Sequence, residues 1–154
     1  MIHFFRKTVE IPISFEEGSD DLPLPSYQTA GSAGLDLYAA VKEEVQIHPG
    51  EFKMISSGIR IALPQGYEAQ IRPRSGLALK HGISIVNTPG TIDSDYRGVI
   101  GIILINFGNV SYTIKRGERI AQMVINQYQK AHLFKLIQLP QTQRKSNGFG
   151  STGK

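Results

Sequence analysis

Short runs of apolar, often β-branched residues recur along the chain and alternate with turn-forming segments. Glycine and proline punctuate the gaps, as at Pro49-Gly50 and Pro89-Gly90. The expected strands span residues 4–15, 35–39, 45–47, 52–55, 59–62, 69–72, 83–86, 99–105, 112–114, 120–124 and 133–137. Many short runs at this spacing predict an all-β fold, either a sandwich or a closed barrel.

One segment departs from the strand pattern. Residues 76–81, Gly-Leu-Ala-Leu-Lys-His, favour a short helical turn. With 154 residues, no internal repeat and no linker, the chain predicts a single β domain over residues 1–140. Residues 141–154 are polar, glycine-rich and basic, which predicts a mobile C-terminal tail. A long acidic, proline-bearing connection occupies residues 16–32, and its sequence does not fix its role.

Composition excludes several classes of protein. The chain has no cysteine, so neither disulfides nor thiolate metal sites are available. The first residues lack the apolar core and cleavage site of a signal peptide. No apolar run approaches the ~20 residues that span a bilayer. We therefore expect a soluble, cytoplasmic protein that does not enter a membrane.

The charge of the chain is mildly positive, with 17 basic and 13 acidic residues. A basic patch can bind nucleic acid, but a small anionic substrate needs only two or three such groups, and solvated surface explains most of them. A module that binds RNA or single-stranded DNA needs exposed aromatic rings for base stacking. Aromatic residues make up 8% of the chain, so we expect no nucleic-acid partner.

The segment from Asn87 to Gly98 joins two apolar runs and carries two carboxylates, Asp93 and Asp95. On a strand, residues i and i+2 share a face, so the pair could bind a metal. In a turn, which we favour, one carboxylate caps the turn while the other does chemistry. Asp93 follows Ile92, which we expect to be buried. Its carboxylate would then emerge from a low-dielectric wall, a setting that suits a general base.

Two further residues flank this candidate site. Tyr96 either belongs to the core or lines a pocket beside Gly98. Gly101 interrupts a run of β-branched residues, and a glycine inside a strand indicates a bulge or the close approach of a ligand. Both residues extend the candidate site toward the following strand.

A second candidate site lies at Arg72-Pro73-Arg74-Ser75-Gly76, where a strand is expected to end and the helical turn to begin. A helix start presents free N–H groups, and with a guanidinium and a hydroxyl beside them it can bind an anion. The alternative is that Ser75 serves as an ordinary N-cap. The local sequence leaves both possibilities open.

The tail at residues 148–154 fits the pattern G-x-x-x-x-G-K of a phosphate-binding loop. That loop needs a strand before it and a helix after it, and this sequence offers no such helix. Flexible glycines can nevertheless wrap phosphate oxygens, while the alternative is a disordered tail. Phe149 argues against disorder, since an aromatic ring in a solvated tail usually stacks on something.

Other catalytic chemistries find no support in the sequence. The four histidines show no ligand spacing, so we assign no transition-metal site. There is neither a nucleophilic serine elbow nor a candidate cysteine. Hydrolysis would therefore use water activated by a carboxylate, together with a phosphate-bound cation.

Five segments of the chain form an ordered set. They are Ala33-Gly-Leu-Asp-Leu-Tyr-Ala-Ala40, Pro73-Arg-Ser-Gly-Leu-Ala-Leu-Lys-His-Gly82, Gly90-Thr-Ile-Asp-Ser-Asp-Tyr-Arg-Gly98, Gly117-Glu-Arg-Ile-Ala-Gln-Met123 and Arg144-Lys-Ser-Asn-Gly-Phe-Gly-Ser-Thr-Gly153. In this order they resemble the motifs of the trimeric dUTPases (deoxyuridine triphosphate nucleotidohydrolases). Each motif alone is modest evidence, but five in sequence define the resemblance.

The resemblance implies a jelly-roll-like β subunit and a homotrimer, with the tail of one subunit closing over a neighbour's site. It implies hydrolysis of dUTP to dUMP and pyrophosphate, which keeps uracil out of DNA and supplies dUMP. Asp93 would activate the water that attacks the α-phosphorus in line. Asp36 would help to place Mg²⁺ through waters, because Mg²⁺ tends to keep much of its hydration shell.

The resemblance also implies which residues bind substrate. Uracil would be read by Asn87 and by the backbone of the 91–101 hairpin, which includes Thr91, Ile92 and Gly101; cytosine would reverse a donor–acceptor pair there. Tyr96 would pack under the deoxyribose and exclude a 2′-hydroxyl. The phosphates would be held by Arg74, Ser75, Gly76 and Gln122. From the tail, Arg144 would clamp the γ-phosphate and Phe149, followed by Gly150 and Ser151, would stack on uracil.

The related dCTP deaminases share this fold and are the alternative within the resemblance. They carry a glutamate on the strand after the aspartate-bearing hairpin. Here that strand, residues 99–105, has no carboxylate, and Ile103 occupies the expected place. The deaminases also lack a tail like residues 144–153. Both differences favour a dUTP pyrophosphohydrolase.

Overall fold

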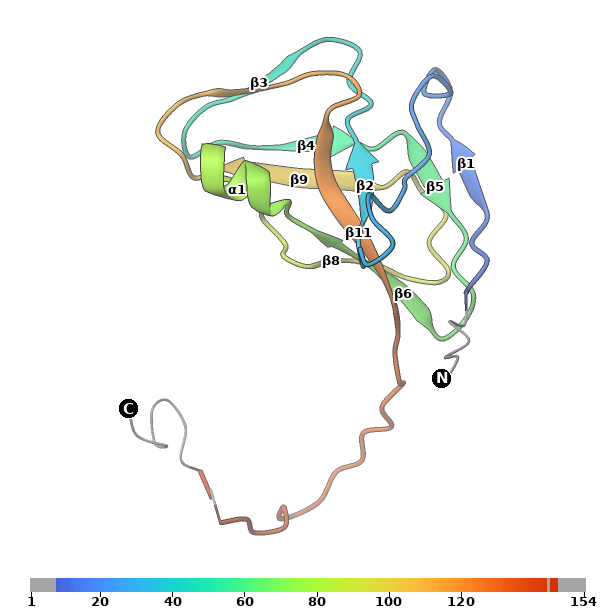
Figure 1. The fold of residues 1–154 in the computed structure, drawn as a ribbon. Helices are drawn as coiled ribbons and strands as arrows, with labels where there is room; N and C mark the ends of the chain where they lie inside the picture. The colour runs from blue at the N-terminus through green and yellow to red at the C-terminus, as the bar shows by residue number, and fades with distance from the viewer. Residues whose placement is uncertain (1–7, 144, 147–154) are drawn as a thin grey trace.

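A computed structural model describes residues 8–143 and 145–146, and within them it places eleven strands and one helix (Figure 1). The helix, α1 (Ser75–His81), lies where the sequence predicts a helical turn. The strands are β1 (Ile13–Phe15), β2 (Leu35–Tyr38), β3 (Val45–Ile47), β4 (Phe52–Ser56), β5 (Ile59–Ile61), β6 (Tyr67–Arg72), β7 (Ile83–Ile85), β8 (Gly90–Ile92), β9 (Gly101–Asn106), β10 (Tyr112–Ile114) and β11 (Arg119–Gln127). The predicted β fold with one short helix is confirmed.

The strands form four sheets in which every pairing is antiparallel. The two larger sheets have the strand orders β2-β11-β6-β8 and β4-β9-β7, and the pairs β1-β5 and β10-β3 complete the set. In both larger sheets the neighbours are distant in sequence. This order brings the first and fourth sequence motifs, on β2 and β11, side by side.

Burial alternates along the strands as a two-faced sheet requires. In β9, Ile102, Leu104 and Asn106 are buried, while Ile103 and Ile105 on the other face are half-buried. The inward side chains of both larger sheets meet in one hydrophobic core. The run at 99–105 therefore has an outer face, and part of that face borders the cavity described below.

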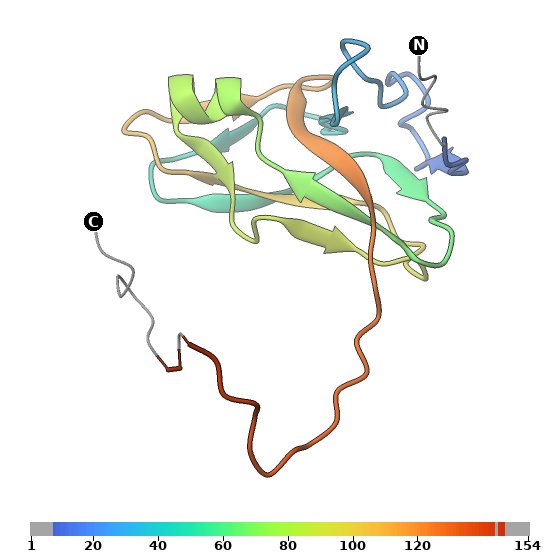
Figure 2. The same cartoon turned by 60° about the horizontal axis from the view of Figure 1, so that its bottom comes forward.

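Two strand predictions are wrong: the first strand is shorter than expected, and the last one does not form. Within the expected 4–15 strand, only Ile13–Phe15 pairs as a strand among the described residues. Residues 133–137 form no strand, and Leu133 and Ile137 are 90% and 108% exposed. The chain after β11 runs clear of the sheets (Figure 2), so its backbone has no strand in the same chain to pair with.

The strand β8 was not anticipated from the sequence. Its three residues follow Pro89 and contain Gly90, two residues that favour turns, yet they pair with β6 from Ala69 to Ile71. The segment between β7 and β9 is therefore a loop, a short strand and a second loop. The strand fixes where Asp93, the next residue, begins the second loop.

The acidic connection at 16–32 is fastened to the body by Arg116. Its guanidinium donates to the carbonyl oxygen of Gly18 at 2.7 Å, to Asp21 Oδ2 at 3.0 Å and to the carbonyl oxygen of Val41 at 3.1 Å. The hydrogen bonds from Arg116 hold the pKa of the exposed Asp21 carboxyl below its ordinary value.

No helix among the described residues is long and apolar enough to span a bilayer.

Candidate functional site

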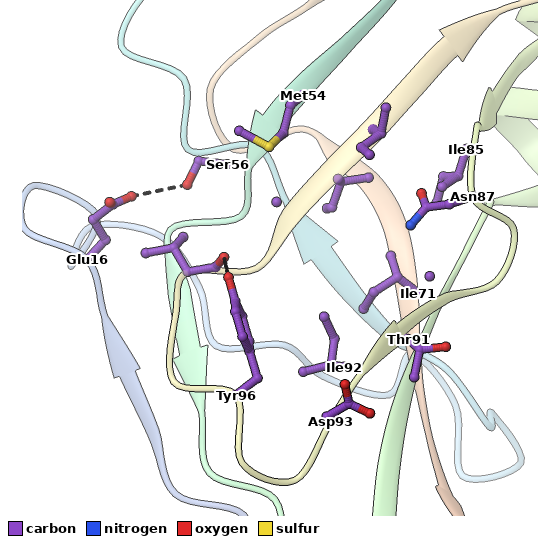
Figure 3. A pocket seen from close by; sticks show the side chains of 15 residues that line it. Glu16, Met54, Ser56, Ile71, Ile85, Asn87, Thr91, Ile92, Asp93 and Tyr96 are labelled. Carbon is purple, nitrogen blue, oxygen red and sulfur yellow. Dashed lines mark hydrogen bonds between the residues drawn. The ribbon is translucent and has the colours of Figure 1, made fainter.

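A cavity of about 490 Å³ opens between the β8 segment and the outer face of β9 (Figure 3). Its walls are largely apolar, with Ile71, Ile85 and Ile103 among them. The structure brings to it the residues of one subunit that were predicted to read the base and sugar, together with Asp93, the predicted general base: Asn87, Thr91, Ile92, Tyr96 and Gly101. An apolar cavity with a few polar groups is the usual form of a small-molecule site.

Asp93 stands at the end of β8, where its carbonyl oxygen accepts a hydrogen bond from the Tyr96 N–H at 3.2 Å and closes a turn. Its carboxylate lines the cavity and makes no hydrogen bond to another described residue. Asp95 is exposed and does not line the cavity. The turn therefore separates the two carboxylates, but neither of them caps it with a hydrogen bond from a described residue.

The expected low-dielectric wall around Asp93 is absent in the single chain. Ile92 is half-buried rather than buried, and Asp93 is exposed. The reason is that β8 is an edge strand of its sheet, so no neighbouring strand covers its outer side.

Tyr96 belongs to the cavity and not to the core. Its hydroxyl donates to the carbonyl oxygen of Val99 at 3.0 Å, the dashed line at Tyr96 in Figure 3. Its ring stands against Gly98. A Cβ at Gly98 would lie 2.3 Å from the tyrosine oxygen, so a glycine is needed there. Gly101 lies opposite Ser56 of β4 in a regular register, which excludes a bulge there. A Cβ at Gly101 would lie 2.9 Å from Met54 Sδ, so the glycine leaves the space that the Met54 side chain needs.

A second cavity, of about 260 Å³, lies on the other side of β6 and is mostly polar. It collects the predicted phosphate and metal residues, which come from β2, α1 and β11: Asp36, Arg74, Ser75, Gly76 and Gln122. The Gln122 amide is held in place because Nε2 donates to the carbonyl oxygen of Pro73 at 2.8 Å. No side chain of this cavity lines the first one.

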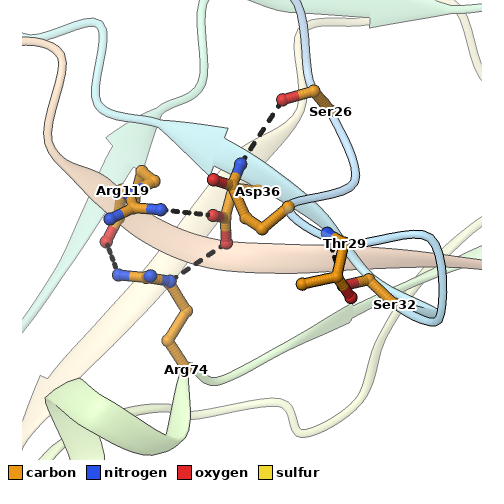
Figure 4. Close-up of polar contacts among 7 residues, drawn as sticks. Ser26, Thr29, Ser32, Asp36, Arg74 and Arg119 are labelled. Atoms are coloured by element: carbon orange, nitrogen blue, oxygen red, sulfur yellow. Dashed lines mark hydrogen bonds and ion pairs between the residues drawn. The ribbon is translucent and has the colours of Figure 1, made fainter.

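Asp36 is buried and bridges two guanidinium groups (Figure 4). Its Oδ1 accepts from Arg74 Nε at 3.0 Å, and its Oδ2 accepts from Arg119 Nη1 at 3.1 Å. Arg74 Nη1 also donates to the carbonyl oxygen of Arg119 at 3.0 Å. Arg119 does not itself line this cavity, but with Arg74 and Asp36 it forms a cluster of net positive charge beside it, which suits an anion; we call this the cationic cavity.

Ser75 is not an N-cap. It is the first residue of α1, the N-cap is Arg74, and no side chain caps the helix. The helix ends at Gly82, whose φ of 69° is a left-handed conformation that glycine adopts without strain. The Ser75 hydroxyl is exposed and lines the cationic cavity, as the anion-site interpretation requires.

Sequence reasoning missed three residues that border these sites. Glu16 lines the first cavity and accepts a hydrogen bond from Ser56 Oγ at 3.1 Å. Gln28 lines the second cavity, and Arg119 pairs with Asp36. Glu16 and Gln28 lie in the acidic connection and gave no signal, whereas Arg119 lies inside the fourth motif. The predicted tail residues, Arg144, Phe149, Gly150 and Ser151, lie outside the described residues.

An apolar cavity with an unpartnered carboxylate and, across β6, a polar cavity of guanidinium and hydroxyl groups suit the class of all-β proteins that bind small anionic molecules. Comparison with known proteins narrows this class. The dUTPase family model matches residues 20–153, and the chain belongs to the dUTPase family. It is a dUTP diphosphatase with the jelly-roll-like fold of that family.

The relatives agree over nearly the whole chain. A deoxyuridine 5′-triphosphate nucleotidohydrolase of Caldanaerobacter subterraneus subsp. tengcongensis is 56% identical over 146 residues, which cover 95% of this chain and 99% of that protein. One of a Thermoanaerobacter species is 55% identical with the same coverage. A solved Staphylococcus bacteriophage 80alpha dUTPase variant with dUpNHpp is 26% identical, has a TM-score of 0.84, and is matched over 96% of this chain and 100% of that one.

Proposed function

We propose that this dUTPase acts by in-line attack of an Asp93-activated water on the α-phosphorus of dUTP. The observation that supports this assignment is the Asp93 carboxylate, which lines the apolar cavity without a hydrogen-bonding partner among the described residues. Asp36, the other candidate carboxylate, has both oxygens hydrogen-bonded to arginines, so neither oxygen is open to a water.

The chemistry balances without a covalent intermediate. A water oxygen forms a bond to the α-phosphorus while Asp93 takes one of its protons. The bond from the α-phosphorus to the bridging oxygen of the β-phosphate breaks, and the electron pair leaves with pyrophosphate. The products are dUMP and pyrophosphate, and the proton on Asp93 is later returned to water.

The apolar cavity supports recognition of uracil and deoxyribose. Asn87 extends its amide toward the cavity (Figure 3), and Thr91, Ile92 and Gly101 contribute backbone groups to its wall. A cytosine would present a donor where uracil presents an acceptor and would leave buried groups unpaired. The Tyr96 ring, fixed by its bond to Val99, would lie under the sugar and leave no room for a 2′-hydroxyl.

The cationic cavity supports phosphate binding by Arg74, Ser75, Gly76 and Gln122. Because this cavity and the one with Asp93 are separate in one chain, we propose that a second copy brings its phosphate side to the Asp93 cavity in a homotrimer. The chain after β11 supports this assembly, since Phe134 and Leu139 expose 70% and 78% of their surface. The tail residues Arg144, Phe149, Gly150 and Ser151 would then close over a neighbour's site.

The family generally uses Mg²⁺. The residues near the phosphate site fit an ion that is bound through substrate phosphates and waters. A direct bond from Asp36 does not fit, because both carboxylate oxygens are bonded to guanidinium groups. The described residues contain no cluster of three metal-ligating side chains either. The ion would instead be carried by substrate phosphates and its own waters, where it would neutralise charge on the leaving pyrophosphate.

Shared sites predict complementation between two inactive variants. Asp93→Asn and Arg74→Gln each remove one half of the site, so each homotrimer should be nearly inactive. Mixed trimers refolded from both chains should regain activity, because some sites then combine an intact Asp93 with an intact Arg74. If mixing restores nothing although the chains exchange, each site belongs to one chain and the shared-site proposal is wrong.

The activity itself is tested by measuring pyrophosphate release from dUTP, dCTP, dTTP and UTP side by side. We expect release from dUTP and at least about 10²-fold slower release from the others, because dCTP would leave buried polar groups unpaired, whereas UTP and dTTP carry an extra hydroxyl or methyl group. Ammonia release from dCTP would instead indicate a deaminase. Half-buried Ile103, which lines the cavity where the deaminases carry a glutamate, favours the first result.

A further inference from the structure

The pairing of β11 with β2 contains a register shift between Arg119 and Ala121. Gln122 lies directly opposite Asp36, so in an unbroken register Arg119 would fall on the opposite face of the sheet from Asp36. The shift sets Arg119 opposite Tyr38 instead, and Tyr38 shares the face of Asp36. A β-bulge of this kind re-aims a side chain, and here it aims Arg119 at Asp36.

The bulge gives Arg74 two anchors. The Asp36 carboxylate, itself held by the Arg119 side chain, accepts from Arg74 Nε, and the bulged carbonyl of Arg119 accepts from Arg74 Nη1 (Figure 4). Both anchors involve Arg119: its side chain holds the Asp36 carboxylate, and its backbone carbonyl accepts from Arg74 directly. The Asp36 side chain is only 9% exposed, so little water competes for these bonds.

The Nη2 nitrogen of the Arg74 guanidinium remains available to bind a ligand. Nη2 makes no hydrogen bond within the described part of the chain, and Arg74 lines the cationic cavity together with Ser75 and Gly76. A guanidinium whose other two nitrogens are fixed binds phosphate at a smaller entropic cost than a free one.

On the basis of the proposed function, we propose that Arg119 is a positioning residue for dUTP hydrolysis, which fixes the Arg74 guanidinium through Asp36. Arg119 has no other side-chain hydrogen bond among the described residues, and its side chain is 43% exposed. Its side chain is therefore not required by the core, and its removal should affect substrate binding more than folding.

The test is steady-state hydrolysis of dUTP by Arg119→Gln and Arg119→Lys. Arg119→Gln should raise KM about tenfold, the size of one lost charge-assisted hydrogen bond, and change kcat less than about threefold, since phosphate is held in both ground and transition states. Arg119→Lys keeps the charge beside Asp36 and should recover most of the loss. Lys115→Gln, which removes the cation of the exposed ion pair with Glu44 at 3.3 Å, is the control, because neither residue lines either cavity, and it should keep the wild-type KM.

A double-mutant cycle separates positioning from direct contact. In an Arg74→Gln background, where turnover is too low for a KM, Arg119→Gln should add no further increase in the Kd for dUTP measured by calorimetry, because it acts through Arg74. An additive increase there, an unchanged KM in Arg119→Gln alone, or no recovery in Arg119→Lys would each overturn the proposal. Failure of the wild-type protein to hydrolyse dUTP would instead remove the proposed function. If a thermal melt shows that Arg119→Gln does not fold, the same double-mutant cycle is run with Asp36→Asn, which removes the other partner of the ion pair.

Discussion

The substitution Gly98→Ala tests how strictly the site depends on the position of Tyr96. A Cβ at residue 98 would lie 2.3 Å from the tyrosine oxygen and 2.5 Å from Cζ. Non-bonded carbon atoms rest about 3.5 Å apart, so the ring has to move by about 1 Å. That movement also breaks the 3.0 Å hydrogen bond from the Tyr96 hydroxyl to the Val99 carbonyl oxygen.

The expected effects on stability and on activity differ in size. Tyr96 is 44% exposed, so its movement costs little buried surface, and the lost hydrogen bond is worth about 1 kcal/mol. For a domain of this size, that lowers Tm by about 2–4 °C. A displacement of about 1 Å in a residue that positions substrate can cost up to about 10²-fold, so kcat/KM for dUTP should fall by about 10- to 100-fold.

The assay is pyrophosphate release from dUTP and UTP, together with a thermal melt of each variant. The selectivity for dUTP over UTP should also fall, because the ring that excludes the 2′-hydroxyl has moved. Gly31→Ala is the matched control, since no atom lies within 4 Å of a Cβ there and its φ is not positive. If Gly98→Ala keeps the activity and selectivity of Gly31→Ala, the placement of Tyr96 under the sugar is wrong.

Three further predictions follow from single contacts. Asp93→Asn should bind dUTP with nearly unchanged affinity in calorimetry while turnover falls about 10²-fold or more, and near-normal turnover would exclude Asp93 as the base. In Gly34→Ala the new Cβ would lie 2.3 Å from Gln122 Oε1, so the Gln122 amide must leave the cationic cavity. The KM for dUTP should then rise with little change in kcat. An unchanged KM would show that Gln122 does not bind phosphate. Burial and the hydrogen bond to Glu118 raise the pKa of the Tyr112 phenol above its ordinary 10.0, so its protonated form contributes stability that is complete below about pH 10 and is lost above it. Urea unfolding should therefore show a shallower alkaline loss of stability in Tyr112→Phe than in wild type, and equal slopes would contradict the assignment.

Much of the fold was predictable because burial on one face of a strand leaves an alternating or apolar pattern. The pattern failed where strand formation depends on a partner that is far away in sequence. Gly90–Ile92 is only three residues long and begins with the turn signal Pro89-Gly90, yet it pairs because Ala69–Ile71 offers an open edge. Residues 133–137 have the composition of a strand and no edge to pair with in the single chain.

The candidate site was predicted more completely than its internal contacts. Residue types and motif order were enough to select Asp93, Tyr96 and Arg74, and the structure places each beside one of the two cavities. The ion pairs of Asp36 were not predictable, because its two arginines lie 38 and 83 residues away along the chain. Asp36, which the resemblance places near Mg²⁺ through waters, also anchors two guanidinium groups.

The separation of the two cavities has a physical origin in β6. Its residues Ala69–Ile71 pair with β8 on one edge, and Tyr67–Arg72 pair with β11 on the other. β6 therefore stands between the strand that ends at Asp93 and the strand that carries Gln122. To bring both residues to one phosphorus atom within a single chain, one of these ladders would have to open, at a cost of several backbone hydrogen bonds. Association of two intact sheets would need no such opening, which favours the proposed site shared between copies over one that joins Asp93 and Gln122 within a single chain.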